Sequence, residues 1–496
     1  MDKDKEKAEP AKVDPLVAAV GDVKRWQFGI IVWVFLSKFG TGSHTLAIVF
    51  LAAPIEFKCS NPGPEVPACS PDCSERTFNR SVFTENIISE WDLTCDRAFL
   101  SNLSQTIVMF GIMVGSMFFG VISDKYGRKP AFLGCCFMQL ITGPIVSLSP
   151  WFWFHCLFRF LVSFATGGTM MTSFVLLMEV IGPRWRELIS ITYQIPFNMG
   201  HASVAVWAYF FRHWRAYYLA ISLVSLVYIP YFWVIPETPR WLLATGNIDK
   251  AVATLEKAAK INKMPTESIR GNIEEVYKAK LAATEVKKGT MLDLFKYPNL
   301  CVKTIVMAFD WLVVCLIYYG VAQYMSGLSG DIFINIFISA MLCIPGTLLC
   351  VPLTKYCGRK FTFIASNFLS GFPMLLIAAI PNIEGLPKIS LAALGLFGSS
   401  ITFPNAYLYA GELFPTVVRN SGVGFCSLVG RVGSMIAPFV TQMGDFGEWV
   451  PPLIFGVFGI AAALSIFLLP ETKGYPIPDT IEEGEQFGKK VKQTEK

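Results

Sequence analysis

The chain has 496 residues, of which 53% are hydrophobic and 14% aromatic, with a net charge of +5 and a mean hydropathy of +0.48. This composition is too apolar for a soluble domain of this length and indicates a protein that crosses the membrane several times. The positive charge lies mostly in the predicted inner loops and tails, so it orients the chain in the membrane and is no sign of nucleic-acid binding.

The chain starts with a polar segment, residues 1–25, which is predicted to be a cytoplasmic tail. Its first part, Met1–Lys12, is rich in Lys, Glu, Ala and Pro, a composition typical of disorder. No cleavable signal peptide is recognisable, because no small-residue cleavage site follows the apolar run that starts near Trp26. We therefore expect that first apolar run to direct the chain to the membrane.

Twelve apolar runs of about 20 residues follow, the length that a bilayer core requires. They predict an all-α polytopic membrane protein with twelve transmembrane helices. Because twelve is an even number and most Lys and Arg fall on one side, both termini are predicted to be cytoplasmic. The runs cover residues 26–53, 98–122, 130–149, 151–178, 188–211, 216–235, 301–323, 331–353, 361–381, 389–410, 420–443 and 451–469.

A hydrophilic insert, residues 54–97, follows the first run and is predicted to face outward. It holds four of the thirteen cysteines. An oxidising compartment would pair these four as two disulfides, in one of three connectivities. Asn79-Arg80-Ser81 is a glycosylation sequon in the same insert, so Asn79 is a predicted glycosylation site. The four cysteines are Cys59, Cys69, Cys73 and Cys95.

A second insert, residues 236–300, is predicted to face inward and to link two halves of the chain. Asn247–Lys260 and Pro265–Ala283 within it show helical periodicity and mixed charge, as surface helices do. Lys303, at the start of the next apolar run, is expected to snorkel to the inner surface. Residues 470–496 are predicted to form a second cytoplasmic tail.

Charged motifs of the first half recur in the second half at a nearly constant offset. The pairs are Gly127 and Gly358, Glu179 and Glu412, Arg186 and Arg419, and Glu237 and Glu471, separated by 231 to 234 residues. Such a duplication indicates two homologous six-helix bundles, residues 26–235 and 301–469. Two parallel six-span repeats are typical of a secondary transporter that rocks around a site at the membrane midplane.

Several of these charges fall at cytoplasmic span ends. Opposite charges of the two halves are expected to pair there in one access state and to separate in the other. The alternative is that they are ordinary turn and topogenic residues, since exposed ion pairs are individually worth only ~0–1 kcal/mol. The expected gating residues are Asp124, Gly127, Arg128, Glu179, Arg186, Glu412 and Arg419.

Ionisable residues inside the apolar runs are the default candidates for a substrate site. Lys38 lies in the first run, Asp310 in the seventh and Arg431 in the eleventh. Arginine grips a carboxylate through two hydrogen bonds, so Arg431 is expected to bind a substrate carboxylate; the alternative is a permanent pair with Asp310 or another acid. For Arg159, a fixed structural partner within the N-terminal bundle is as good an explanation as a role in the substrate site. His44 is expected to be a packing residue.

The turn Gly120–Lys129 and the motifs Pro236–Leu242 and Pro470–Gly474 resemble those of the major facilitator superfamily. The cysteine-bearing insert, which ends in Glu90–Arg97, and the segment Glu412–Asn420 resemble the organic cation/carnitine/anion transporter family within it. The resemblance covers nearly the whole chain. It implies the two-bundle major facilitator fold and carriage of small organic ions by alternating access.

The resemblance also implies which side chains line the cavity. Gln194 and Phe197 match cavity positions of the family, as do Trp311 and Tyr318, and each pair shares one helix face. Typical cation carriers have Asp where this chain has Arg431, whereas anion and carnitine-type carriers resemble this chain. The expected substrate-binding residues are Lys38, Gln194, Phe197, Asp310, Trp311, Tyr318 and Arg431.

The chain departs from the family pattern at two further positions. Lys355 stands where family members have an acidic residue, so the second charged turn is expected to latch less tightly than the first. Two residues before Pro345, where cation carriers usually place a Glu, this chain has Cys343.

The leading hypothesis is a plasma-membrane secondary transporter of small organic ions, zwitterionic, anionic or cationic, with a carnitine-like or organic-anion-like substrate favoured by Arg431. The alternatives are an organic cation facilitator and, more remotely, a sugar-porter-like facilitator or a non-transporting membrane receptor. An enzyme, a cofactor and a metal are not expected, because the sequence has no nucleotide-binding Gly-rich loop and no metal-spaced His/Cys set. The expected partners are the organic ion and the lipid bilayer, with a coupling or exchange ion left open.

Overall fold

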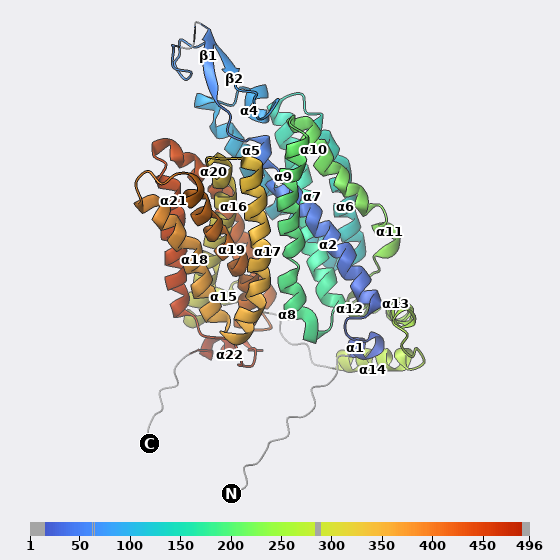
Figure 1. Cartoon of the computed structure of the whole chain (residues 1–496). Coiled ribbons are helices and arrows are strands. Elements are labelled where there is room, and N and C mark those ends of the chain that lie inside the picture. Colours follow the sequence, from blue (N-terminus) through green and yellow to red (C-terminus); the bar gives the residue numbers. More distant parts are fainter. Residues whose placement is uncertain (1–14, 62, 64, 283–288, 489–496) are drawn as a thin grey trace, which may run out of the picture.

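The computed structural model describes residues 15–61, 63, 65–282 and 289–488, and it shows long helices that run side by side (Figure 1). One end of the molecule carries a small two-stranded sheet, and we call it the loop end. The other end carries α1 (Pro15–Val20) and α22 (Ile481–Gln486), and we call it the tail end. The segment predicted to be disordered and the linker residues 283–288 lie outside the described residues.

Eleven helices within the described ranges are long and apolar enough to span a membrane. They form two bundles, so the predicted all-α, two-bundle fold is confirmed. The N-terminal bundle contains α2 (Arg25–Leu46), α3 (Ile48–Leu51), α5 (Phe99–Tyr126), α6 (Arg128–Ser147), α7 (Phe152–Val180), α8 (Pro183–Thr192), α9 (Ile195–Phe210), α10 (Trp214–Leu223) and α11 (Tyr231–Val234). The C-terminal bundle contains α16 (Pro298–Tyr324), α17 (Ile332–Tyr356), α18 (Arg359–Ala379), α19 (Gly385–Leu413), α20 (Arg419–Gln442) and α21 (Val450–Ser465).

One of the twelve predicted spans, the run 188–211, is not among these eleven, because it is not one continuous helix. It consists of α8, with 10 residues, and α9, with 16 residues, which meet at Tyr193 and Gln194. Pro196 is within the first two positions of α9. Because proline has no N–H, it cannot continue the hydrogen-bond ladder of the preceding helix. The two pieces together lie beside α17, where the bundles meet (Figure 1).

The duplicated charged turns adopt the same structure in both bundles. Gly127 connects α5 to α6 with φ +114°, and Gly358 connects α17 to α18 with φ +95°, a region that favours glycine. The carboxylate of Glu237 accepts hydrogen bonds from the backbone N–H groups of the two residues that follow Gly127. Glu471 does the same after Gly358. The sequence duplication is therefore a duplication of local structure.

Glycines let the helices approach closely within each bundle. A Cβ at Gly115 of α5 would lie 1.9 Å from the carbonyl oxygen of Phe164 on α7. A Cβ at Gly433 of α20 would lie 2.2 Å from the carbonyl oxygen of Leu312 on α16. Small residues at such crossings are how membrane helices gain packing contacts in the absence of a hydrophobic driving force between them.

The predicted outer insert is a braced loop at the loop end. Strands β1 (Phe57–Asn61) and β2 (Glu75–Phe78) pair antiparallel, and α4 (Ile87–Glu90) follows them. The three possible connectivities reduce to one, because the structure joins Cys59 to Cys73 and Cys69 to Cys95. Glu90 ties the loop to the N-terminal bundle by pairing with Arg215 and with the indole N–H of Trp214, and Glu85 pairs with His213.

Short helices cover the tail end. The linker contains α12 (Pro239–Ala244), α13 (Ile248–Ile261), α14 (Ile269–Ala282) and α15 (Asp293–Lys296), of which α13 and α14 coincide with the two predicted surface helices. Lys303 does not snorkel to the surface. It is 1% exposed, and its ammonium donates to the carbonyl oxygens of Gly484 and Phe487 at 2.8 and 2.7 Å. The expectation was wrong because the last segment of the chain folds over this position.

Candidate functional site

Lys38 is a buried cation whose neighbours are aromatic rings. It lies on α2, and its Nζ is 4.6 Å from the ring centroid of Tyr193 and 5.2 Å from that of Phe197. Both rings come from the region of the broken span. Cation–π contacts of this kind are worth ~2 kcal/mol when the cation is desolvated. Within the described ranges, no carboxylate pairs with this ammonium group.

Arg431 faces Lys38 from the other bundle. It lies on α20 and contacts Met170, whose carbonyl oxygen accepts a hydrogen bond from the hydroxyl of Tyr193, the ring beside Lys38. Its Nη2 is 4.0 Å from Sδ of Met170 on α7, and Tyr319 and Tyr407 surround the guanidinium group. Its Nη1 is buried and has no hydrogen-bond partner in the described part of the chain. Two cations without a carboxylate therefore lie together where the bundles meet.

Aromatic rings connect these two cations. The ring of Phe197 is 6.3 Å from that of Tyr318, and the ring of Trp311 is 4.4 Å from that of Tyr407. Tyr318 also donates a hydrogen bond of 2.8 Å to Asn198, on the other bundle. The structure thus brings together five of the seven predicted substrate-binding residues, namely Lys38, Phe197, Trp311, Tyr318 and Arg431.

Neither of the other two predicted residues makes a side-chain hydrogen bond with this cluster in the described part of the chain. Asp310 is fully buried inside the C-terminal bundle, where Asn367 and Ser465 donate hydrogen bonds of 2.9 and 3.0 Å to its two oxygens. It does not pair with Arg431, so the alternative of a permanent ion pair between these two residues is not observed. Gln194 is half-buried at the break between α8 and α9, next to Tyr193.

Three predicted gating residues of the N-terminal bundle, Asp124, Arg128 and Glu179, form one network at its tail end. Arg128 pairs with Asp124 at 2.5 Å and with Glu179 at 2.7 Å. Glu179 also accepts a hydrogen bond from the hydroxyl of Thr238. Burial raises the pKa of the neighbouring Glu237. The hydrogen bonds that its carboxylate accepts from backbone N–H groups oppose this rise. All these contacts stay within one half of the molecule.

The C-terminal bundle repeats this network with one difference. Arg359 pairs with Glu412 at 3.0 Å, and Glu412 accepts a hydrogen bond of 2.6 Å from Thr472. Lys355 replaces the acid that Asp124 provides in the other half. Arg359 instead reaches across the interface to Glu187, which follows Arg186 on α8, with an N–O distance of 3.4 Å. This ion pair joins the two bundles at the tail end.

Arg186 and Arg419 have the same role in their two loops. Each donates from Nε to the carbonyl oxygen five residues earlier, Ile181 and Phe414 respectively, at 3.3 Å. Arg419 also donates to the hydroxyl of Thr416 at 2.9 Å. These contacts close the short loops before α8 and α20.

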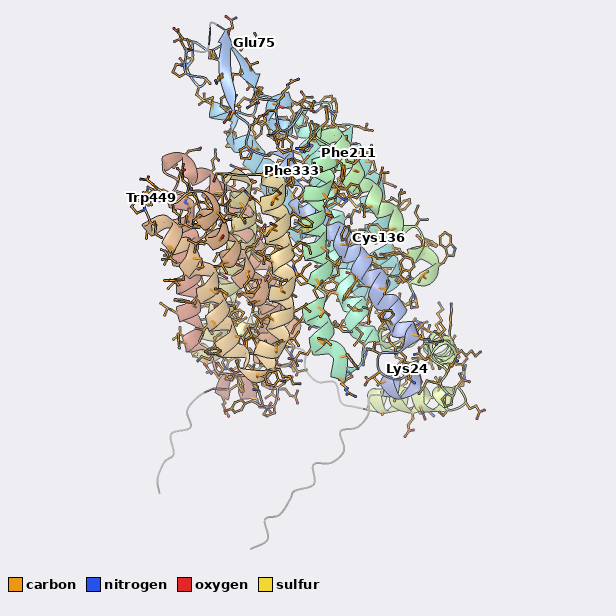
Figure 2. All side chains as sticks on the ribbon, viewed as in Figure 1. Lys24, Glu75, Cys136, Phe211, Phe333 and Trp449 are labelled. Atoms are coloured by element: carbon orange, nitrogen blue, oxygen red, sulfur yellow. A yellow bond between two sulfur atoms is a disulfide. The ribbon has the colours of Figure 1, made fainter. Side chains whose placement is uncertain are left out.

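The bundles also touch at the loop end. The ring of Phe333, labelled in Figure 2, stacks on that of Phe50 with centroids 5.4 Å apart. Asn102 donates to Gln442 at 2.6 Å, and Thr106 donates to the carbonyl oxygen of Met435 at 3.1 Å. Contacts between the bundles therefore lie above and below the paired cations.

Sequence reasoning missed Glu187, Asn198 and Tyr407. Glu187 escaped because its counterpart at the repeat offset is Asn420, so a search for duplicated charges cannot find it. Asn198 carried a signal, since it is a polar residue inside an apolar run and one position after Phe197. Tyr407 had none, because tyrosines and phenylalanines are abundant in every span.

Comparisons with known proteins show the family to which this chain belongs. The profile of the family described as "Sugar (and other) transporter" matches residues 74–482. An organic cation transporter protein of Drosophila melanogaster is 33% identical to this chain, over 96% of this chain and 95% of the relative. Solute carrier family 22 member 3 of Mus musculus is 34% identical over 81% and 72%. Solute carrier family 22 member 12 of Homo sapiens is 31% identical over 82% and 74%.

Solved structures show the same fold. The inward open conformation of the xylose transporter XylE from E. coli matches with a TM-score of 0.68 at 15% identity, covering 92% of this chain and 99% of that chain. A partially occluded inward open conformation of the same transporter matches with a TM-score of 0.66, also at 15% identity. At this identity the likeness concerns the fold alone.

Proposed function

Because this chain belongs to the organic cation/carnitine/anion transporter family of the major facilitator superfamily, we propose that it carries a small organic ion with a carboxylate group across the plasma membrane by alternating access. Like its relatives, it is a secondary transporter of small organic ions, and it is not an enzyme. The proposal concerns the class of substrate, the residues that bind it and the orientation of the chain.

The observation that carries the substrate class is the pair of cations Lys38 and Arg431. Arginine stays protonated in proteins, so Arg431 cannot relieve its burial by losing a proton. An uncompensated buried charge is costly, and its partner is normally a carboxylate. Among the described residues, no carboxylate pairs with Lys38 or Arg431. A carboxylate of the substrate supplies this counter-charge. The unpaired Nη1 of Arg431 is a donor available to a second carboxylate oxygen.

The rings around the cations support an organic rather than an inorganic cargo. Phe197, Tyr318, Trp311 and Tyr407 offer flat apolar surface for stacking, and the same surface holds an organic amine by cation–π contact. A zwitterion of the carnitine type fits both features. An organic cation is the second candidate, favoured by the rings and by the similarity to the organic cation transporter protein of Drosophila melanogaster.

The contacts between the bundles support alternating access. Phe50 with Phe333 and Asn102 with Gln442 join the bundles at the loop end, and Glu187 with Arg359 joins them at the tail end. Opening one set while keeping the other would expose the cations to one side at a time. We propose that these contacts, supported by the predicted gating residues within each bundle, are the two gates.

We propose that the loop end faces outward and both termini face the cytoplasm. Both disulfides lie at the loop end, as expected of an oxidising compartment. Asn79 is exposed there and is the proposed glycosylation site. The lysine- and arginine-rich segments lie at the tail end, in keeping with the positive-inside rule.

Uptake by wild type and by Arg431→Asp tests the substrate class. The substrates are p-aminohippurate, carnitine and tetraethylammonium, each normalised to surface protein. Losing a charge-assisted contact costs ~1.5–3 kcal/mol, so we expect the variant to lose about ten- to a hundredfold in apparent affinity for the two carboxylates. Arg431→Lys, which keeps the charge without the fork, is the matched control and should retain partial affinity.

Two outcomes would contradict the proposal. Rapid tetraethylammonium uptake by the wild type, with no uptake of either carboxylate, would favour the organic cation facilitator. An equal loss for all three substrates in Arg431→Asp, at normal surface amounts, would show that Arg431 supports the fold or the cycle without touching the substrate.

A further inference from the structure

A second buried arginine lies outside the proposed substrate site. Arg159 is on α7, and only 1% of it is exposed. Its Nη2 is 3.5 Å from the side-chain oxygen of Gln105 on α5, and its guanidinium carbon is 5.6 Å from the ring centroid of Tyr218 on α10. These positions lie in the part of the N-terminal bundle nearest the loop end. Both contacts are neutral, so neither balances the positive charge.

Several polar atoms around Arg159 lack partners. In the part of the chain that the structure describes, Nε and Nη1 of Arg159 are buried with no hydrogen-bond partner. The same holds for Nε2 of His44, for Oγ of Ser104 and for both ring nitrogens of His155. Both rings lie beside Arg159. Nδ1 of His44 is 3.3 Å from the hydroxyl of Tyr218, whose ring Arg159 faces, and His155 is four residues before Arg159 on the same face of α7. Buried polar groups are nearly always satisfied, so such a cluster indicates a missing ligand.

Two acids near this end of the bundle are already paired. Glu90 pairs with Arg215 and accepts from Trp214, and Glu85 pairs with His213. The guanidinium group cannot deprotonate, and a buried charge without a counter-charge is strongly unfavourable. Since the described chain provides no carboxylate to Arg159, the compensating charge must come from solution.

We propose that the pocket around Arg159 binds a small inorganic anion of the halide class, held by Nε and Nη1 of Arg159 and by hydroxyl and imidazole donors of Ser104, His44 and His155. Each of these groups can donate a proton to an anion, the neutral imidazoles through one nitrogen each. The ion compensates the charge and stabilises the N-terminal bundle.

Aromatic rings border the cluster. Trp91 and Trp214 lie against His155, with centroids 5.2 and 5.4 Å from it, and Tyr218 contacts both Arg159 and His44. None of these residues contacts Lys38 or Arg431 in the described part of the chain. The proposed anion site therefore shares no residue with the proposed substrate site and does not depend on the substrate class proposed above.

Thermal unfolding of the purified full-length protein in detergent tests the site. Sodium gluconate is replaced stepwise by sodium chloride at constant ionic strength, and unfolding is followed by tryptophan fluorescence. An ion that binds only the folded state should raise the Tm by about 2 °C or more as the site fills. Bromide should act like chloride. Arg159→Gln should abolish the rise, whereas Arg431→Gln should keep it.

Each alternative outcome overturns the proposal. No chloride-dependent rise in the wild type would mean that water, and not an anion, satisfies the cluster. A rise that persists in Arg159→Gln, or disappears in Arg431→Gln, would place the anion elsewhere. If Arg159→Gln does not fold, Ser104→Ala and His155→Phe replace it. Each variant should raise the chloride concentration that gives half of the maximal increase in Tm by about threefold to tenfold. An unchanged concentration in both variants would overturn the site.

Discussion

Gly115 illustrates how a single residue sets the distance between two helices. It lies where α5 crosses α7, and a Cβ there would lie 1.9 Å from the carbonyl oxygen of Phe164. Backbone cannot yield as a flexible side chain can. Gly134 on α6 has no atom within 4 Å of the position of an added Cβ. The two glycines therefore differ in the space that they leave and not in the kind of structure that they occupy.

We expect Gly115→Ala to destabilise the N-terminal bundle by ~1–3 kcal/mol, the usual cost of overpacking. The measurement is the Tm of the purified protein and the amount at the cell surface. Gly134→Ala is the matched control, and we expect it to be neutral or slightly stabilising because alanine favours helix over glycine. Equal Tm values for Gly115→Ala and Gly134→Ala would show that the crossing can widen without cost.

The intramembrane charges were identified from the sequence, but their roles were not. Lys38 and Arg431 come together across the interface, whereas Asp310 is satisfied by Asn367 and Ser465 inside one bundle. Their spans are apolar on all faces, so the sequence does not tell which face of α16 turns toward the cavity. Which polar residue of another helix lies opposite is a matter of tertiary packing.

At the scale of elements, α22 is fixed to the start of α16. The ammonium of Lys303 donates to the carbonyl oxygens of Gly484 and Phe487, and Glu485 accepts from the backbone N–H of Leu300. The end of a short helix thus finds partners for carbonyls that it cannot satisfy itself. A tail of this length would fray without such contacts.

We expect Lys303→Met to lower the free energy of unfolding by ~1–3 kcal/mol, because the two carbonyls lose a charged donor while the buried stem is kept. Thermal unfolding and limited proteolysis of the last segment measure the effect. Lys355→Met is the control, since Lys355 is exposed on α17 and its ammonium lies 5.7 Å from the ring of Tyr356. A tail that is equally protected in both variants would contradict the docking.

The break between α8 and α9 shows what element prediction lacks. Pro196 is visible in the sequence, yet the run 188–211 was predicted as one span. Pro144, Pro345 and Pro404 are equally visible, and they lie inside the continuous helices α6, α17 and α19. Neighbouring helices decide whether the freed backbone groups are satisfied and the helix continues. The charged turns, by contrast, were predictable, because their glycines and acids act locally.

At the scale of the whole molecule, Glu187 is the charged residue that links the bundles at the tail end. Its partner Arg359 keeps a second acid, Glu412, within its own bundle. Removing Glu187 therefore weakens the contact between halves and leaves the network of the C-terminal bundle intact. Removing Glu412 weakens the network of the C-terminal bundle and leaves the contact between the halves in place.

We expect Glu187→Gln to change the rate of uptake at an unchanged surface amount, because the tail end opens more readily. Since Glu187 is 42% exposed, the pair is worth ~0–1 kcal/mol and the change in rate is at most about fivefold. Glu412→Gln should instead lower the Tm. The measurements are uptake per surface molecule and thermal unfolding. A Glu187→Gln protein that loses Tm with normal uptake per molecule would assign the pair to stability.

The fold as a whole followed from the sequence, because span length, loop charge and the repeat offset are properties of the chain. The contacts proposed above as gates did not follow in full. Duplicated charges such as Arg128 and Glu179 pair within one bundle, whereas the pair across the interface uses Glu187, which has no duplicate. A contact between halves is free to differ between the repeats, since symmetry does not require it.

The disulfide-braced loop is fastened to the N-terminal bundle through Glu90 and Glu85, so it travels with that bundle when the halves rock. Its other neighbour is Phe333 of the opposite bundle, which it meets through the ring of Phe83. An antibody that binds this loop and the neighbouring start of α17 at once would hold the two halves together. With the loop end facing outward, as proposed above, the carrier would be open to inhibition by an external clamp that never reaches the substrate site and need not resemble the cargo.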